Sequence, residues 1–165
     1  MPRIHVPDGP GDPEARVWAL RPEMGAAAAA LSQAVYERSI LPVRERELAR
    51  IRIAGINGCA ICLKWRSTPG AAGAVSEAEY VAVATGEVPT TCSPREALVI
   101  DYATRFATDH ESLDDSAFAR LHAAFTDAEI LDLTVCVGGW LALGRTLHVL
   151  GIDDYCPLAG PTQPS

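Results

Sequence analysis

The sequence predicts an all-α fold. Hydrophobic residues make up 48% of the chain but only 6% of it is aromatic, and this alanine- and leucine-rich composition favours helices over strands. At Ser76, Ser93 and Thr126 a hydroxyl residue is followed three positions later by Glu, which is the capping-box spacing that begins a helix. No stretch of useful length alternates between apolar and polar residues as a half-buried strand does.

Length and sequence composition predict one domain with two non-helical ends. A chain of 165 residues is long enough to bury a core as a single domain. Residues 1–20 begin with several prolines and glycines and are expected to form an irregular arm. Residues 21–151 contain all the expected helices. Residues 152–165 include three prolines after Cys156 and are expected to form an extended tail.

A proline separates the first two expected helices. The first runs from residue 21 to about residue 38, with Pro22 in the first turn, where its fixed φ suits a helix. Leu41–Pro42 interrupts the helical pattern. The second helix is expected over residues 44–56, because three residues spaced i, i+3 and i+7 form one stripe: Leu48, Ile51 and Gly55.

A short break precedes a pair of cysteines. Asn57–Gly58 ends the second helix, because both residue types tolerate the left-handed conformation of a helix end. A third helix is expected to start at Cys59 and to run to about Thr68. The break lets the two helices fold against each other, which would bring Glu47 back toward the cysteines.

Four more helices are expected in the second half of the chain. Their ranges are 76–85, 93–108, 115–122 and a last, longest helix from residue 126. The last helix is apolar nearly all round, which is typical of a helix in the centre of a core or at a subunit contact. Because one small domain rarely covers such a helix on every side, we expect a homo-oligomer.

Charge and hydropathy exclude several functional classes. The net charge of −7 and the pI of about 5.0 leave no basic patch, so we expect no nucleic-acid partner. No signal peptide is recognisable at the N-terminus. The longest apolar stretch, residues 130–150, is interrupted by Asp132, Arg145 and His148, so we expect no membrane association. The expected location is the cytoplasm, where cysteines are usually reduced, metal-bound or catalytic.

The Cys59-X-X-Cys62 pair allows three interpretations. As a redox dithiol, it has helical spacing at a helix N-terminus, where free N–H groups and the helix dipole favour thiolate. Arg66, one turn beyond Cys62, is expected to add positive charge on the same face. As half a zinc site, it lacks a second pair of ligands. As two small apolar residues, it carries no chemistry. The residues favour the redox interpretation, and we expect no metal and no cofactor.

Glu47 allows two interpretations. A buried carboxylate beside the cysteines could relay a proton to or from a thiol. Alternatively, Glu47 pairs with Arg50 one turn further along the helix, which taken alone is the commoner role of a helical glutamate.

A resemblance to a known family begins in the run from Leu41 to Cys62, LPVRERELARIRIAGINGCAIC. This run resembles the carboxymuconolactone decarboxylase-like superfamily, and specifically its alkylhydroperoxidase D-like branch. The segment Thr126–Thr134 and the apolar helix that follows it resemble the C-terminal part of that family. The resemblance covers most of residues 21–151.

The resemblance implies an all-helical fold, assembly as a homotrimer or hexamer, and reduction of a hydroperoxide by a dithiol. In that pattern Cys62 is the attacking thiolate, Cys59 is the resolving thiol and Glu47 is the proton relay. The implied reductant is a dithiol or a thioredoxin-like or lipoyl-bearing partner.

One position departs from the family pattern. The family has a histidine four residues after the second cysteine, whereas this chain has Arg66. Histidine exchanges a proton near neutral pH, but arginine stays protonated. Arg66 would therefore stabilise the Cys62 thiolate without shuttling a proton, which predicts a weakened or altered peroxidase. Trp65 and His148 are candidate pocket residues, and His148 would stand in for the missing histidine.

Two other functions stay open. A lactone decarboxylase or related lyase would not depend on a cysteine pair. A non-catalytic oligomer that senses redox state or binds a ligand would assemble normally without turnover.

Overall fold

The computed structural model describes residues 2–67 and 73–152, and this part of the chain is all-helical, as predicted. The elements in chain order are α1 (Pro13–Trp18), α2 (Pro22–Glu37), α3 (Val43–Asn57), α4 (Ala60–Lys64), α5 (Glu77–Thr85), α6 (Pro94–Thr108), the 3₁₀-helix η1 (His110–Ser112), α7 (Asp115–His122) and α8 (Asp127–Leu150).

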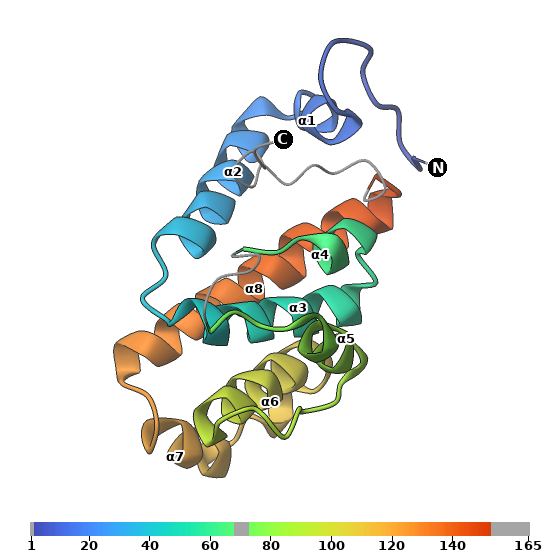
Figure 1. Cartoon of the computed structure of the whole chain (residues 1–165). Coiled ribbons are helices and arrows are strands. Elements are labelled where there is room, and N and C mark those ends of the chain that lie inside the picture. Colours follow the sequence, from blue (N-terminus) through green and yellow to red (C-terminus); the bar gives the residue numbers. More distant parts are fainter. Residues whose placement is uncertain (1, 68–72, 153–165) are drawn as a thin grey trace.

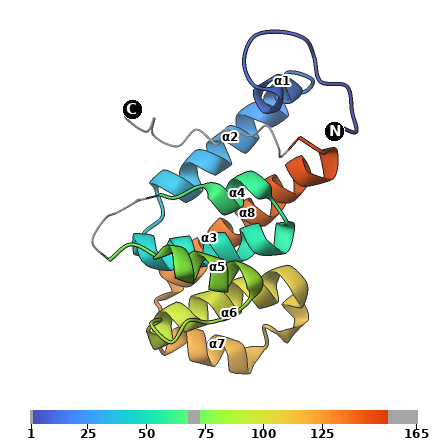
Figure 2. The same ribbon diagram turned by 45° about the vertical axis from the view of Figure 1, so that its right-hand side comes forward.

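Helices α3 and α8 lie side by side in the centre of the molecule (Figure 1). Helix α2 packs against α8, whereas α5 and α6 pack against α3. Figure 2 shows the same order after rotation, with α7 on the far side of α6. The short helix α4 packs against α3. This arrangement places the cysteine segment, which begins at the N-cap of α4, beside α3.

Apolar clusters on two sides hold α3 in place. The larger cluster joins α2, α3, α6 and α8, and it includes Val99, Leu133 and Val137, which are completely shielded from solvent. Burying each such side chain stabilises the fold by about 1.5–3 kcal/mol. The second cluster joins α3 to α5. Gly55 allows that contact, because a Cβ atom at Gly55 would lie 2.0 Å from the carbonyl oxygen of Ala84.

The three predicted capping boxes are present at the starts of α5, α6 and α8. Each capping glutamate also accepts a hydrogen bond from an arginine of another helix: Glu79 and Glu96 from Arg44, and Glu129 from Arg95. The ion pairs therefore tie the start of each of these helices to its neighbour.

The N-terminal arm is partly helical, in contrast to the irregular arm expected over residues 1–20. Helix α1 forms there because a proline occupies its first position, which suits a helix start, and because Val17 is buried against Leu147 and Ile152. Arg3 adds backbone and side-chain hydrogen bonds to the end of α8. Of the expected tail, residues 153–165 lie outside the described residues.

Helix α8 is long and apolar enough to cross a membrane by length and composition alone. It packs against α2, α3 and α6, and 44% of its most apolar 18-residue window is buried. The core helix of a soluble protein has the same length and composition, so this signal for a membrane span is weak.

Candidate functional site

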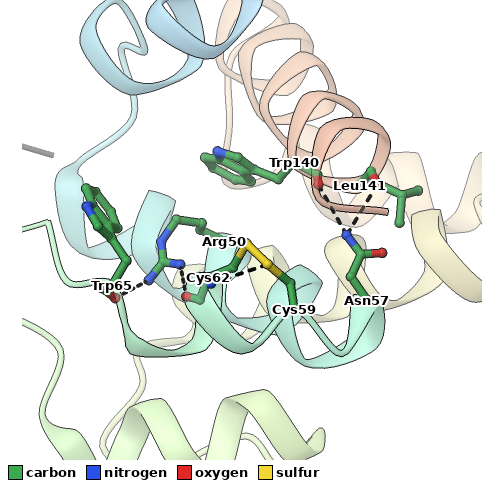
Figure 3. The surroundings of a disulfide bond; sticks show 7 residues. All are labelled: Arg50, Asn57, Cys59, Cys62, Trp65, Trp140 and Leu141. Carbon is green, nitrogen blue, oxygen red and sulfur yellow. Dashed lines mark hydrogen bonds between the residues drawn. A yellow bond between two sulfur atoms is a disulfide. The ribbon is translucent and has the colours of Figure 1, made fainter. Parts of the chain in front are cut away.

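Cys59 and Cys62 form a disulfide at the start of α4, with their Cα atoms 5.3 Å apart (Figure 3). The chain reaches them through Gly58, whose φ of 66° and ψ of 21° end α3 in the left-handed conformation, as predicted. Cys59 then caps α4, because its Sγ accepts a hydrogen bond from the backbone N–H of Cys62 at 3.3 Å. The helix break and the cysteine pair are thus one local structure.

Cys59 and Cys62 differ in their exposure to solvent. Cys59 is 0% exposed, whereas Cys62 is half-buried and lines a cavity of about 450 Å³. Apolar and small residues of α1, α2 and α8 form most of the wall, among them Trp18, Ala28, Ala29, Leu143 and Leu147. A molecule in this cavity can therefore reach Cys62, whereas the Cys59 side chain is shielded from solvent and is not among the described residues that line the cavity.

Asn57 fastens the break to α8. Its Nδ2 donates to the carbonyl oxygens of Trp140 at 3.2 Å and Leu141 at 3.3 Å (Figure 3), and its Oδ1 accepts from Arg145 Nε at 3.1 Å. The residue that sequence reasoning assigned only to a helix end is therefore also a cross-link between α3 and α8 at the cavity.

Glu47 is fully buried and makes three hydrogen bonds. Arg50 donates to its two carboxylate oxygens at 2.8 and 3.0 Å, and the Tyr80 hydroxyl donates to Oε2 at 2.8 Å. The predicted ion pair with Arg50 is therefore confirmed. Burial first, and the Glu47 charge second, raise the pKa of Tyr80 well above its usual value of 10, so this phenol stays a hydrogen-bond donor.

Arg50 connects Glu47 to the cysteine segment. Its Nη1 donates to the carbonyl oxygen of Cys62 at 2.7 Å and its Nη2 donates to that of Trp65 at 3.0 Å. Its guanidinium also lies over the Trp65 ring, 4.8 Å from the centroid. Arg50 lines the same cavity as Cys62. Sequence reasoning identified Arg50 only as a partner of Glu47, because a contact with a segment twelve residues away leaves no local signal.

Arg66 does not continue the face of Cys62. Helix α4 ends at Lys64 and Trp65 is extended, so helical spacing no longer relates Arg66 to Cys62, and the expectation that they share one face is wrong. Arg66 instead donates to both carboxylate oxygens of Glu77 at 2.8 Å and lies over the Tyr80 ring. The pKa of Arg66 is raised, chiefly by the hydrogen bond to Glu77.

Trp65 and His148 are not among the described residues that line the cavity. The Trp65 ring packs against Tyr36, which does line it, with centroids 5.1 Å apart. His148 lies beside the cysteine segment, since a Cβ atom at Gly58 would be 3.7 Å from His148 Cε1. Both candidates therefore lie next to the site, one behind the cavity wall and one beside the helix break.

The other cysteines that the structure describes lack the features of a reactive thiol. Burial first, and the Asp132 charge second, raise the pKa of Cys136 to about 12. Burial also raises the pKa of Cys92. Cys156 lies outside the described residues. Within residues 2–67 and 73–152, no group of three or more His, Cys, Asp or Glu side chains could hold a metal ion.

Comparisons with known proteins agree with the all-helical fold. Residues 22–105 match the model of the carboxymuconolactone decarboxylase family. No curated protein matches the chain. A crystal structure from Agrobacterium tumefaciens, of a protein of unknown function described as a candidate antioxidant defence protein AhpD, is 25% identical to this chain. It matches over 90% of this chain and 95% of its own, with a TM-score of 0.67.

Two further solved structures share the fold. An uncharacterised peroxidase-related protein with an alkylhydroperoxidase AhpD core, from Ralstonia eutropha, is 20% identical over 83% of this chain and 73% of its own, with a TM-score of 0.64. A peroxidase-related protein from Silicibacter is 18% identical over 86% of this chain and 75% of its own, with a TM-score of 0.72. The match to the family model over half of the chain, together with this fold, shows that the protein belongs to the carboxymuconolactone decarboxylase family.

Proposed function

We propose that this protein is a thiol-dependent peroxidase that reduces a hydroperoxide with Cys62 and Cys59. The observation that carries the proposal is the disulfide between a shielded sulfur and a sulfur that faces a cavity. This asymmetry separates an attacking thiol, which must meet the substrate, from a resolving thiol, which must meet only its partner.

The proposed reaction has three steps. The Cys62 thiolate attacks one oxygen of ROOH, the O–O bond breaks, and ROH leaves after gaining one proton, so that Cys62 becomes a sulfenic acid. The Cys59 thiol then attacks the Cys62 sulfur, which forms the disulfide and releases water. A dithiol finally reduces the disulfide and is itself oxidised to a disulfide.

The proton for the leaving oxygen is proposed to come from water in the cavity. Glu47 was a candidate source, but its carboxylate is held by two hydrogen bonds from Arg50 and one from Tyr80. The apolar wall of the cavity favours an organic hydroperoxide over hydrogen peroxide, because the organic group gains free energy by leaving water. The reductant is proposed to be a small dithiol or a thioredoxin-like or lipoyl-bearing protein, in the cytoplasm.

We also propose that the chain assembles with copies of itself through α8. Leu131, Val135 and Val149 are 65%, 46% and 53% exposed, and their spacing places them on one side of the helix. Ile40 is 59% exposed and lies close by, since its backbone N–H donates to Asp132 of α8. A second copy would cover this exposed apolar stripe.

The test uses the reduced full-length protein, cumene hydroperoxide and dihydrolipoamide. Peroxide consumption should accompany formation of the Cys59–Cys62 disulfide, measured by mass spectrometry. Cys62→Ser should abolish consumption, whereas Cys59→Ser should leave a sulfenic acid on Cys62 that dimedone traps. Wild-type protein that consumes no hydroperoxide with small dithiols, thioredoxin or lipoyl donors would contradict the proposal.

A further inference from the structure

The cavity contains a cation that neither the sequence pattern nor the family resemblance identifies. Of the described residues that line it, Arg50 carries a positive charge and lies against the segment of Cys62. Arg50 is 2% exposed, so water screens its charge only weakly and its effect on a neighbouring sulfur is stronger than that of a surface cation.

The hydrogen bonds of Arg50 fix its position relative to Cys62. Two bonds to Glu47 anchor the guanidinium to its own helix, and two further bonds reach the carbonyl oxygens of Cys62 and Trp65. Figure 3 shows the guanidinium between Trp65 and the disulfide. The guanidinium is therefore held on the cysteine side of the Glu47–Arg50 pair, with the carboxylate behind it.

Resting on the proposed peroxidase function, we propose that Arg50 is the positioning residue that stabilises the Cys62 thiolate, the role the sequence assigned to Arg66. Arg66 also donates to the carbonyl oxygens of Leu63 and Trp65, but it is not among the described residues that line the cavity, and its carboxylate partner Glu77 has a side chain that is 74% exposed. Arg50 provides a fixed positive charge on the inner side of the cysteine segment. The Glu47 carboxylate, which accepts two hydrogen bonds from Arg50, reduces the effect of that charge on Cys62.

Other charged groups also lie near the cysteine segment. They are Asp12 at the N-cap of α1, which lines the cavity, Lys64 of α4, which is exposed, Arg145 of α8, which donates to Asn57, and His148 of α8 beside Gly58. Tyr80 of α5 keeps its proton because its pKa is raised. The proposal rests on Arg50 because its guanidinium donates to the carbonyl oxygen of Cys62 itself and lines the cavity with Cys62.

The proposal predicts opposite effects for the two members of the ion pair. In a Cys59→Ser background, Glu47→Gln should speed alkylation of Cys62 by iodoacetamide at pH 7, because it leaves the Arg50 charge without its partner. The double variant Glu47→Gln/Arg50→Met should slow it about tenfold, the rate change expected for one pKa unit. Arg50→Lys should slow alkylation less than the double variant does, because it keeps a positive charge although lysine cannot reproduce the bidentate bonds to Glu47.

The experiment measures alkylation of Cys62 against pH by mass spectrometry, with circular dichroism and thermal unfolding to verify the fold. Arg50→Met alone leaves the carboxylate of Glu47 buried and unpaired, which disfavours folding. For this reason the test uses the double variant, which removes both charges. The proposal would be overturned if Glu47→Gln and the double variant Glu47→Gln/Arg50→Met changed the alkylation rate in the same direction. It would also be overturned if the double variant left the rate unchanged. A tenfold slower alkylation of Cys62 in Arg66→Met would overturn it as well. Alkylation needs no hydroperoxide, so this result is independent of whether the protein is a peroxidase.

Discussion

Gly144 of α8 lies directly against Cys62, since a Cβ atom at Gly144 would be 3.9 Å from the Cys62 sulfur. The same atom would be 3.0 Å from Nδ2 of Asn57, the side chain that fastens the helix break to α8. A glycine inside the longest helix therefore sets how closely α8 approaches the redox pair.

Replacing this glycine should impair the site without weakening the helix. Gly144→Ala should slow disulfide formation by cumene hydroperoxide several-fold, because the added methyl group displaces Asn57 and with it the cysteine segment. Stopped-flow measurement of thiol loss checks this result. Gly138→Ala is the matched control, since its Cβ would meet only the Phe106 ring at an ordinary 3.7 Å. Equal rates in the two variants would contradict the assigned contact.

A second glycine should matter for stability instead. Gly55→Ala places a methyl group 2.0 Å from the carbonyl oxygen of Ala84, so α5 must move away from α3. Overpacking of this kind costs about 1–3 kcal/mol, which over most of that range exceeds the roughly 1 kcal/mol that alanine gains over glycine in a helix. Urea unfolding should show a lower midpoint than wild type. An unchanged or higher midpoint would show that the α3–α5 contact is looser than described.

The ion pairs at the helix starts predict acid sensitivity. Hydrogen bonds from the Thr126 backbone and then Arg95 lower the pKa of Glu129 to about 2, and Arg44 holds the pKa of Glu79 well below its usual 4.5. A carboxylate with a lowered folded-state pKa contributes stability above its unfolded pKa, and this contribution is lost as the pH falls through the folded value.

Stability should therefore decline from about pH 4.5 towards pH 2, as measured by urea unfolding at several pH values. Glu79→Gln should reduce stability at pH 7 and make the decline with pH shallower. The exposed Glu87→Gln, which lies outside these ion pairs, should keep the wild-type profile. If the two variants gave the same pH dependence, the role of the Arg44–Glu79 pair would be contradicted.

The proposed assembly through α8 predicts the effect of a charge on its exposed side. Leu131→Glu should lower the molar mass measured by light scattering after size exclusion, because a carboxylate cannot be buried unpaired in an apolar contact. Val81→Glu is the control, since Val81 is 66% exposed on α5 and lies off the stripe. A monomeric wild type, or an oligomer that Leu131→Glu leaves intact, would contradict the proposed contact.

Much of the fold was predictable because its signals are local. The three capping boxes and the break at Asn57–Gly58 act through hydrogen bonds and backbone conformations within a few residues. The length of α4 was not predictable in this way. Trp65 leaves the helix where its carbonyl oxygen meets Arg50 and its ring meets Tyr36, and both contacts come from other helices.

The sequence by itself determined the helical class, the capping of the helices, the break before the cysteines and the presence of a cysteine pair with redox spacing. Only the tertiary structure decided which sulfur faces the cavity and which cation stands beside it. Arg66 is close to Cys62 in sequence but is engaged by Glu77, whereas Arg50 precedes Cys62 by twelve residues and contacts its carbonyl oxygen. The physical reason is that burial and long-range packing set the charge environment of a thiol, and neither can be read from the spacing of residues along the chain.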